Sequence, residues 1–242
     1  MTAWQHAALT QGPIKRAALL GALLVFALPA LALAHGIGGK DAVFVATSHG
    51  AQIVPFLYLG AKHMVTGYDH LLFILGVIFF LYRLSHVALY VTMFSIGHSI
   101  TLLTGVLTGV QVNPYLIDAI IGLSVAYKAF DNLGGFQTLL GVQPNTKLAV
   151  LIFGLFHGFG LATKLQTLHP SKDGLVANMI SFNVGVECGQ LIALSLMLGL
   201  ILWWRRSSGF ARQAVLANAL ILIAGFVLMD VQLAGFFTQK AI

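Results

Sequence analysis

Residues 62–73 read KHMVTGYDHLLF, a stretch that sets two histidines and an aspartate at the start of a long apolar run. Ionisable side chains in a membrane span are costly, so they mark candidate functional sites by default. His63 and His70 are seven residues apart, about two helical turns, and share one face of a continuous helix. Asp69 is expected to point elsewhere, toward a neighbouring helix. The stretch therefore predicts a polar site at the mouth of a membrane span.

The composition of the whole chain is that of an integral membrane protein. Of its 242 residues, 58% are hydrophobic and 8% are charged, whereas soluble domains carry roughly 25% charged residues. The net charge of +6 does not indicate nucleic-acid binding, because the basic residues lie at the ends of apolar runs, where they set topology and contact lipid headgroups. The single cysteine, Cys188, excludes an internal disulfide and a four-thiolate metal site.

Residues 1–34 have the features of a secretory signal peptide. A basic pair precedes an apolar core that Pro29 ends, and Ala-Leu-Ala at 32–34 offers a small-x-small cleavage sequence. Cleavage there would place His35 at the mature N-terminus, where an amine and an imidazole could bind one metal ion of the Cu or Ni type. The alternative is that His35 is simply the residue that follows the cleavage site.

The rest of the chain predicts an all-α polytopic membrane bundle of six spans. Residues 35–62 are expected to form an external segment, which contains His49 and ends in a short surface-lying or half-buried amphipathic helix over 51–62; residues 63–242 would form the transmembrane domain. Each apolar stretch is near the roughly 20 residues that cross a bilayer, and lipid requires backbone groups to be satisfied within helices. The expected spans cover about 67–82, 87–107, 115–130, 147–165, 175–203 and 213–236.

The basic residues predict an orientation in the membrane. If the spans alternate, one side collects Arg83, Lys147, Arg205, Arg206 and Arg212. By the positive-inside rule this side is cytoplasmic. We therefore expect a protein of the bacterial inner membrane with its mature N-terminus and its C-terminus both external, and with the stretch at 62–73 at the outer end of the first span.

Polar side chains recur on four of the expected spans and form a candidate metal site. Glu187 is expected to face inward with Asn183 and Gln190, because spacings of four and three keep these residues on one helix face. Imidazole with carboxylate suits Ni, Zn, Cu, Co or Fe. A lone buried His can instead bond a backbone carbonyl, and Asn183 and Gln190 are more typical of interhelical hydrogen-bond partners. The candidate ligands are His63, Asp69, His70, His98, His157 and Glu187, with His35, His49, Asn183 and Asp118 given lower weight.

Four ordered motifs resemble the HupE/UreJ family of membrane proteins associated with hydrogenase and urease. They are GAKH at 60–63 with GYDHLLF at 67–73, FSIGHSITL at 94–102, FGLFHGFG at 153–160 and FNVGVECGQ at 182–190. The likeness covers about residues 55–205. It implies six spans behind a cleaved signal and movement of Ni²⁺ across the inner membrane. It also implies that the His-x5-Asp-His element, here His63, Asp69 and His70, is the signature metal motif.

These observations predict a permease for a divalent transition-metal ion, with Ni²⁺ as the leading candidate. External ions would meet the signature motif and then pass to His98, His157 and Glu187. Incomplete shells of His and carboxylate fit a conduction path, which must release its ion. The sequence lacks a Walker-type phosphate loop, so direct use of ATP is not expected. No permanently bound cofactor is expected, and the expected partners are the metal ion, membrane lipids and periplasmic or cytoplasmic proteins that donate or accept the metal.

A second hypothesis is a membrane metalloprotein that does not transport. Here His70, His98 and His157 would hold a haem or a fixed metal ion, because a b-type haem needs only two facing histidines. Enzymatic activity is not expected: His98 and Ser99 are adjacent and point about 100° apart on a helix, and the Gly-x-Ser-x-Gly elbow is missing from the sequence. Oligomeric state is not indicated by the sequence.

Overall fold

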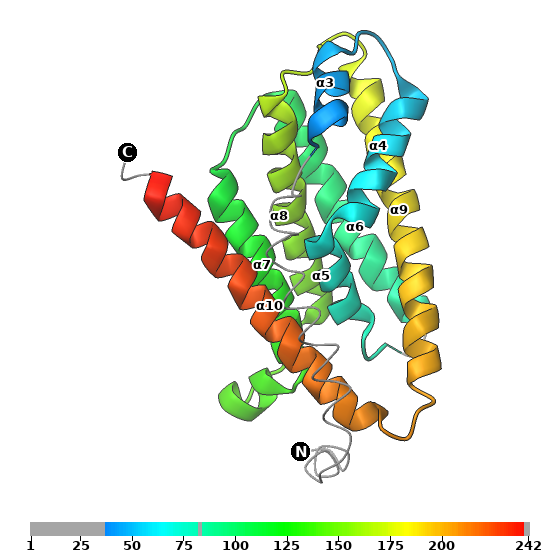
Figure 1. Ribbon diagram of the computed structural model, residues 1–242, viewed down its shortest axis with the longest axis vertical. Helices are drawn as coiled ribbons and strands as arrows, with labels where there is room; N and C mark the ends of the chain where they lie inside the picture. Colours follow the sequence, from blue (N-terminus) through cyan, green and yellow to red (C-terminus); the bar gives the residue numbers. More distant parts are fainter. Residues whose placement is uncertain (1–36, 82–83, 240–242) are drawn as a thin grey trace.

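The computed structural model describes residues 37–81 and 84–239, which form helices and contain no strand (Figure 1). The expected all-α class is thus confirmed for this part of the chain, whereas the expected signal peptide, His35 and Arg83 lie outside it. The elements are α3 (Gly39–Thr47), α4 (Ile53–Thr66), α5 (Tyr68–Ile78), α6 (Leu84–Thr108), α7 (Pro114–Asn132), the short π-helix η1 (Phe136–Leu140), α8 (Thr146–Thr167), α9 (Leu175–Trp204) and α10 (Phe210–Gln239).

Four of the described helices, α6, α8, α9 and α10, are long and apolar enough to cross a membrane. The chain is therefore a multi-pass membrane protein. The other two expected spans are less regular. α7 has 19 residues but carries Asp118, Lys128 and Asp131, and the helix of the first expected span, α5, has only 11 residues.

Three pairs of helices lie side by side in the bundle: α4 with α9, α6 with α8, and α7 with α10 (Figure 1). Glycines permit this close approach, because a Cβ at these positions would collide with the neighbouring backbone. Gly60 of α4 lies against the carbonyl group of Phe182 in α9, and Gly158 of α8 lies against that of His98 in α6. The second contact places the middle of α6 and the middle of α8 at the same level, which positions the site described below.

A break at Gly67, where the first expected span begins, separates α4 from α5. The Gly67 amide still donates to the His63 carbonyl at 2.9 Å, and the Leu71 amide donates to the Gly67 carbonyl at 3.0 Å. Gly67 itself has an extended backbone, with φ −73° and ψ 96°. The half-buried helix expected over 51–62 is the first part of α4, which continues to Thr66 and buries one face against α9.

The opposite end of α5 is held by a network of polar side chains. Lys128 Nζ lies 2.6 Å from Asp131 Oδ2 and 2.8 Å from Asn132 Oδ1. Asn132 in turn donates to the Gly76 carbonyl of α5, at 2.8 Å. Arg205, at the end of α9, donates to the Phe79 carbonyl just after α5, at 2.6 Å. This end of the bundle also carries Lys147, Arg206 and Arg212, at the ends of α8, α9 and α10 (Figure 1), and we refer to it as the basic end.

Candidate metal centre

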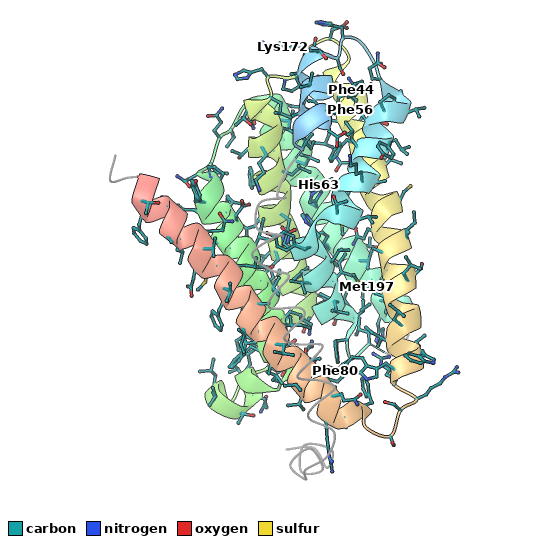
Figure 2. The ribbon with its side chains drawn as sticks, viewed as in Figure 1. Phe44, Phe56, His63, Phe80, Lys172 and Met197 are labelled. Carbon is teal, nitrogen blue, oxygen red and sulfur yellow. The ribbon has the colours of Figure 1, made fainter. Side chains whose placement is uncertain are left out.

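Four helices bring His63, Asp69, His70, His98 and His157 together, and we call these five residues the His cluster. His63 lies in the last turn of α4, at its junction with α5 (Figure 2). The His70 ring is the centre of the group: its centroid lies 5.1 Å from that of His63, 4.8 Å from that of His157 and 6.1 Å from that of His98. Residues 94 positions apart in the sequence, from 63 to 157, thus meet at one point inside the bundle.

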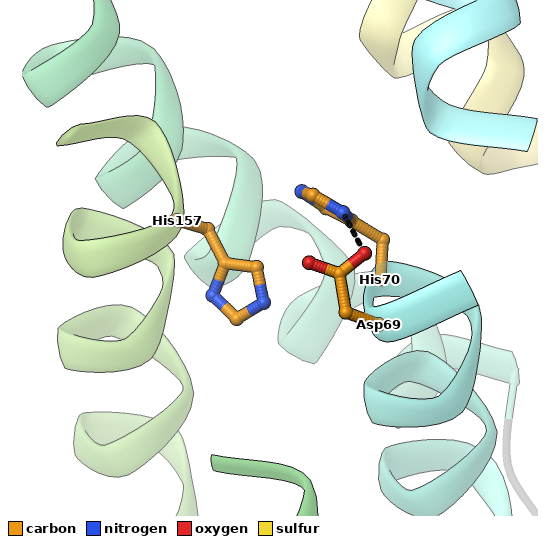
Figure 3. Close-up of side chains that lie close together, drawn as sticks. All are labelled: Asp69, His70 and His157. Carbon is orange, nitrogen blue, oxygen red and sulfur yellow. Dashed lines mark hydrogen bonds and ion pairs between the residues drawn. The ribbon is translucent and has the colours of Figure 1, made fainter. Parts of the chain in front are cut away.

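Asp69, His70 and His157 form the tightest part of the His cluster. Each can offer one ligand atom, and these three atoms all lie within 4.8 Å of one another. Figure 3 shows Asp69 and His70 on α5 facing His157 on α8. The three residues are only 2%, 3% and 1% exposed. Two imidazole nitrogens and one carboxylate oxygen at this spacing are a suitable ligand set for a borderline divalent metal ion.

Asp69 contacts its own neighbour, and this corrects the expectation that it points away from the His70 face. Its Oδ1 lies 3.0 Å from His70 Nδ1. A carboxylate accepts a hydrogen bond from the ring, which fixes the proton on Nδ1 and leaves Nε2 as the metal-binding nitrogen. The absence of a side chain at Gly67 makes room for the pair, because a Cβ on residue 67 would lie 2.9 Å from His70 Nδ1. The expectation failed because it assumed a continuous helix through this position.

His157 is oriented by its own helix. Its Nδ1 lies 2.8 Å from the carbonyl oxygen of Phe153, one turn earlier in α8. A carbonyl oxygen only accepts, so Nδ1 carries the proton and Nε2 is again the nitrogen that can bind a metal ion. Two different acceptors, a carboxylate for His70 and a carbonyl for His157, thus select the same tautomer.

His98 is a deeply buried member of the His cluster whose ring is not oriented by a hydrogen bond from the described residues. It is 1% exposed, and among the described residues neither of its ring nitrogens has a hydrogen-bond partner. Buried polar groups are nearly always hydrogen-bonded, so an orphaned imidazole of this kind calls for an explanation. Coordination of a metal ion or contact with its water shell would supply the missing interaction.

Two phenylalanine rings line the His cluster. The sequence did not predict them as part of the site. Phe94 lies 5.0 Å from the His157 ring and 6.0 Å from the His98 ring, and Phe73 lies 5.5 Å from the His157 ring. Apolar walls exclude water and so strengthen the attraction between a cation and its ligands. Both residues stand inside the motifs quoted above, and their positions four residues before His98 and three after His70 were the available signal.

Comparison with known proteins assigns a family to this arrangement. The family model described as HupE / UreJ protein matches residues 39–240. The chain belongs to the HupE/UreJ family. No significant match was found among curated proteins or among solved structures. The match spans all described helices up to the end of α10, so the His cluster of this HupE/UreJ protein lies wholly within the family region.

Glu187 does not belong to the His cluster of this HupE/UreJ protein. Its side chain is exposed, whereas Asn183 and Gln190 are buried. Glu187 instead continues an exposed stripe of α9 formed by Ile180, Val184 and Leu191. The expectation that Glu187 faces the interior of the bundle is therefore wrong. Spacings of three and four place residues within about 60° of each other, so they cannot separate the inward face of a helix from its edge.

The lower-weight candidates have other surroundings. Asp118 of α7 forms an ion pair with Lys164 of α8, at 2.8 Å. His49 is exposed in the loop between α3 and α4. Asn183 is buried, and its amide atoms have no hydrogen-bond partner among the described residues. Gln190 accepts a hydrogen bond from Ser95 Oγ at 2.8 Å, which confirms its expected part as an interhelical partner.

Proposed function

We propose that this protein is an inner-membrane permease for a divalent transition-metal ion, with Ni²⁺ as its cargo. The observation that supports the proposal is the set of ligand atoms of Asp69, His70 and His157, within 4.8 Å of one another and buried between membrane helices. Intramembrane ionisable groups are kept for function because their burial is costly. Membership of the HupE/UreJ family supports a membrane metal transporter or accessory protein.

The proposed ion path begins at the outer end of α5. His63 is half-buried, whereas the other members of the His cluster are buried, so His63 is the first imidazole that an ion meets. Lys62 is exposed beside His63 and forms an ion pair with Asp41 of α3 at 2.7 Å. This pair neutralises the positive charge of Lys62 at the entrance of the proposed ion path. The basic end of the bundle would face the cytoplasm. In this arrangement six spans follow a cleaved signal, with both mature termini external.

The chemistry of the His cluster suits transient binding. Asp69 supplies one negative charge, which offsets part of the cost of removing a divalent cation from water, and the imidazoles replace lost water ligands. Orienting bonds hold Nε2 of His70 and of His157 ready for an ion, and water would complete the shell. A site that binds its ion weakly enough to release it is what conduction requires. Transport would be driven by the membrane potential or a proton gradient.

The alternative of a haem protein fits this geometry less well. Axial ligation places two imidazoles on opposite faces of a flat macrocycle. In this protein the Phe94 ring lies within 6.2 Å of the His70 ring, 6.0 Å of the His98 ring and 5.0 Å of the His157 ring. The imidazole rings also pack against one another, with the His70 centroid 4.8 Å from that of His157 and 6.1 Å from that of His98, so this arrangement does not fit a macrocycle between them. The geometry favours a bare or partly hydrated ion.

The proposal is tested by Ni²⁺ uptake in cells that express His70→Ala or His157→Ala. Both variants should lose uptake at normal protein levels, because each removes one ligand of the tightest group. His86→Ala is the matched control, since His86 is exposed at the start of α6. Wild-type Ni²⁺ uptake by both His70→Ala and His157→Ala would contradict the proposal. The same assay with Co²⁺, Zn²⁺, Cu²⁺ and Fe²⁺ tests whether Ni²⁺ is the cargo.

A further inference from the structure

A small, mainly apolar cavity lies beside the His cluster. Side chains of α5, α6, α8 and α9 line it, and Phe73 and Phe94 are among them. The same two rings also contact His157, at 5.5 Å and 5.0 Å between centroids. The Phe73 and Phe94 rings are themselves 5.4 Å apart. This pair of rings therefore borders both the cavity and the His cluster.

The cavity lies on the basic-end side of the His cluster. Its lining on α5 runs from Phe73 to Val77, and the next residue, Ile78, accepts a hydrogen bond from Arg205 at the basic end. Its lining on α6 includes Tyr90 and Val91, which are half-buried and precede Phe94 by about one turn. An ion that leaves His70 toward the basic end would meet this cavity next.

Gln190 supplies the amide group in the cavity wall. It is 1% exposed, its Oε1 accepts from Ser95 Oγ at 2.8 Å, and its Nε2 has no hydrogen-bond partner among the described residues. A hydroxyl group both donates and accepts. A half-turn of the amide therefore keeps a bond to Ser95 and exchanges the positions of Oε1 and Nε2. Gln190 can offer an oxygen ligand to a cation without losing its anchor.

We propose that this cavity is the inner section of the ion route, too narrow for a hydrated ion in this structure, and that Gln190 is its polar contact for a partly hydrated divalent cation. The inference rests on the function proposed above. The cavity has room for about one water molecule, so a hydrated ion passes only when Phe73 and Phe94 move apart. Apolar constrictions of this kind gate by excluding water.

The test separates binding from passage. Purified variants are compared by calorimetric titration with Ni²⁺ in detergent and by Ni²⁺ uptake into proteoliposomes. Val91→Phe fills the cavity and should bind Ni²⁺ like wild type, because the His cluster is untouched. Gln190→Leu removes the polar contact of the cavity, and Ni²⁺ uptake should fall severalfold in both variants. Val91→Thr keeps the shape and adds a hydroxyl, so it should wet the cavity and raise uptake. Val184→Phe is the matched control, because Val184 is exposed on α9.

The outcomes distinguish the two proposals. Wild-type uptake by a folded Val91→Phe protein that binds Ni²⁺ overturns the inner section of the route and leaves the His cluster untouched. If Val91→Phe does not fold, unchanged uptake by both Gln190→Leu and Val91→Thr overturns it equally. A wild-type protein that neither binds nor transports Ni²⁺ removes the proposed function, and this inference with it.

Discussion

Asp69 Oδ1 lies 3.0 Å from His70 Nδ1, although the two residues are neighbours in the sequence. Adjacent residues on a regular helix point about 100° apart, so the contact depends on their place in the first turn of α5, directly after the break at Gly67. The carboxylate has two effects. It fixes the His70 tautomer, and it brings a negative charge to a site that must accept a cation.

Asp69→Asn tests the charge of this pair. Asparagine has the same shape and can still accept a hydrogen bond from Nδ1, but it cannot offset the charge of the ion. Replacing such an orienting carboxylate typically costs about 10–100-fold in metal affinity. We expect a loss in that range in calorimetric titration with Ni²⁺, with an unchanged helical circular dichroism spectrum. Asp173→Asn, in the exposed loop before α9, is the control. Equal affinity of wild type and Asp69→Asn would show that the charge has no part in binding.

Gly67→Ala tests the geometry of the same pair. The added Cβ would lie 2.9 Å from His70 Nδ1 and 3.3 Å from Asp69 Oδ1, so one of these groups must shift. We expect Ni²⁺ affinity to fall by about tenfold, in the range seen when groups that orient metal ligands are disturbed. Gly199→Ala is a matched control in α9, where an added Cβ meets nothing within 4 Å. It should leave affinity unchanged and stabilise the helix by up to about 1 kcal/mol. Equal affinity of the two variants would contradict the crowding described at Gly67.

The apolar helices were the part of the fold that could be predicted. α6, α8, α9 and α10 follow from long hydrophobic runs, since in lipid such a run has few alternatives to a helix. The start of α4 was harder to place, because its apolar stretch is short and is helical here through close contact with α9. That contact depends on Gly60 and Gly185, whose partners lie more than a hundred residues away.

The histidines of the candidate site were predicted from the sequence, but the side chains that surround them were not. The four histidines stand out because ionisable groups are rare in apolar runs. Glu187 is also an ionisable residue in an apolar run, yet it lies on an exposed stripe. It was wrongly predicted because helical spacing shows which residues share a face but not what covers that face. Phe73 and Phe94 were missed although they lie three residues after His70 and four before His98, because phenylalanine is common in every membrane helix. Their position became visible only once α5, α6 and α8 were packed together.

His98→Leu is expected to make the metal-free protein more stable and less active. The substitution removes an imidazole whose two nitrogens lack hydrogen-bond partners among the described residues. Leaving such a group unsatisfied costs about 1–3 kcal/mol, so unfolding in detergent without metal should shift in favour of the variant by about this amount, while Ni²⁺ uptake falls. His157→Leu is the contrasting variant, because it loses the bond to the Phe153 carbonyl. Equal stability changes in the two variants would contradict the orphaned state of His98.

Lys128→Met probes the network at the basic end of the bundle. Lys128 is buried and lies 2.6 Å from Asp131 Oδ2, with both side chains less than 10% exposed. Removing one member of a buried ion pair leaves the other charge uncompensated and costs about 3–5 kcal/mol. We expect a loss of this size in the free energy of unfolding, measured by denaturant titration in detergent.

The double variant Lys128→Met/Asp131→Leu shows whether that loss comes from the stranded charge. Replacing both members of a buried pair by apolar side chains is often neutral, so the double variant should recover most of the stability. Full recovery is not expected, because Asp131 also accepts a hydrogen bond from Gln143 at 2.6 Å, which ties the loop before α8 to α7. A double variant as unstable as Lys128→Met would instead assign the loss to the hydrogen bond between Lys128 and Asn132. Asn132 in turn joins α7 to α5 through its bond to the Gly76 carbonyl.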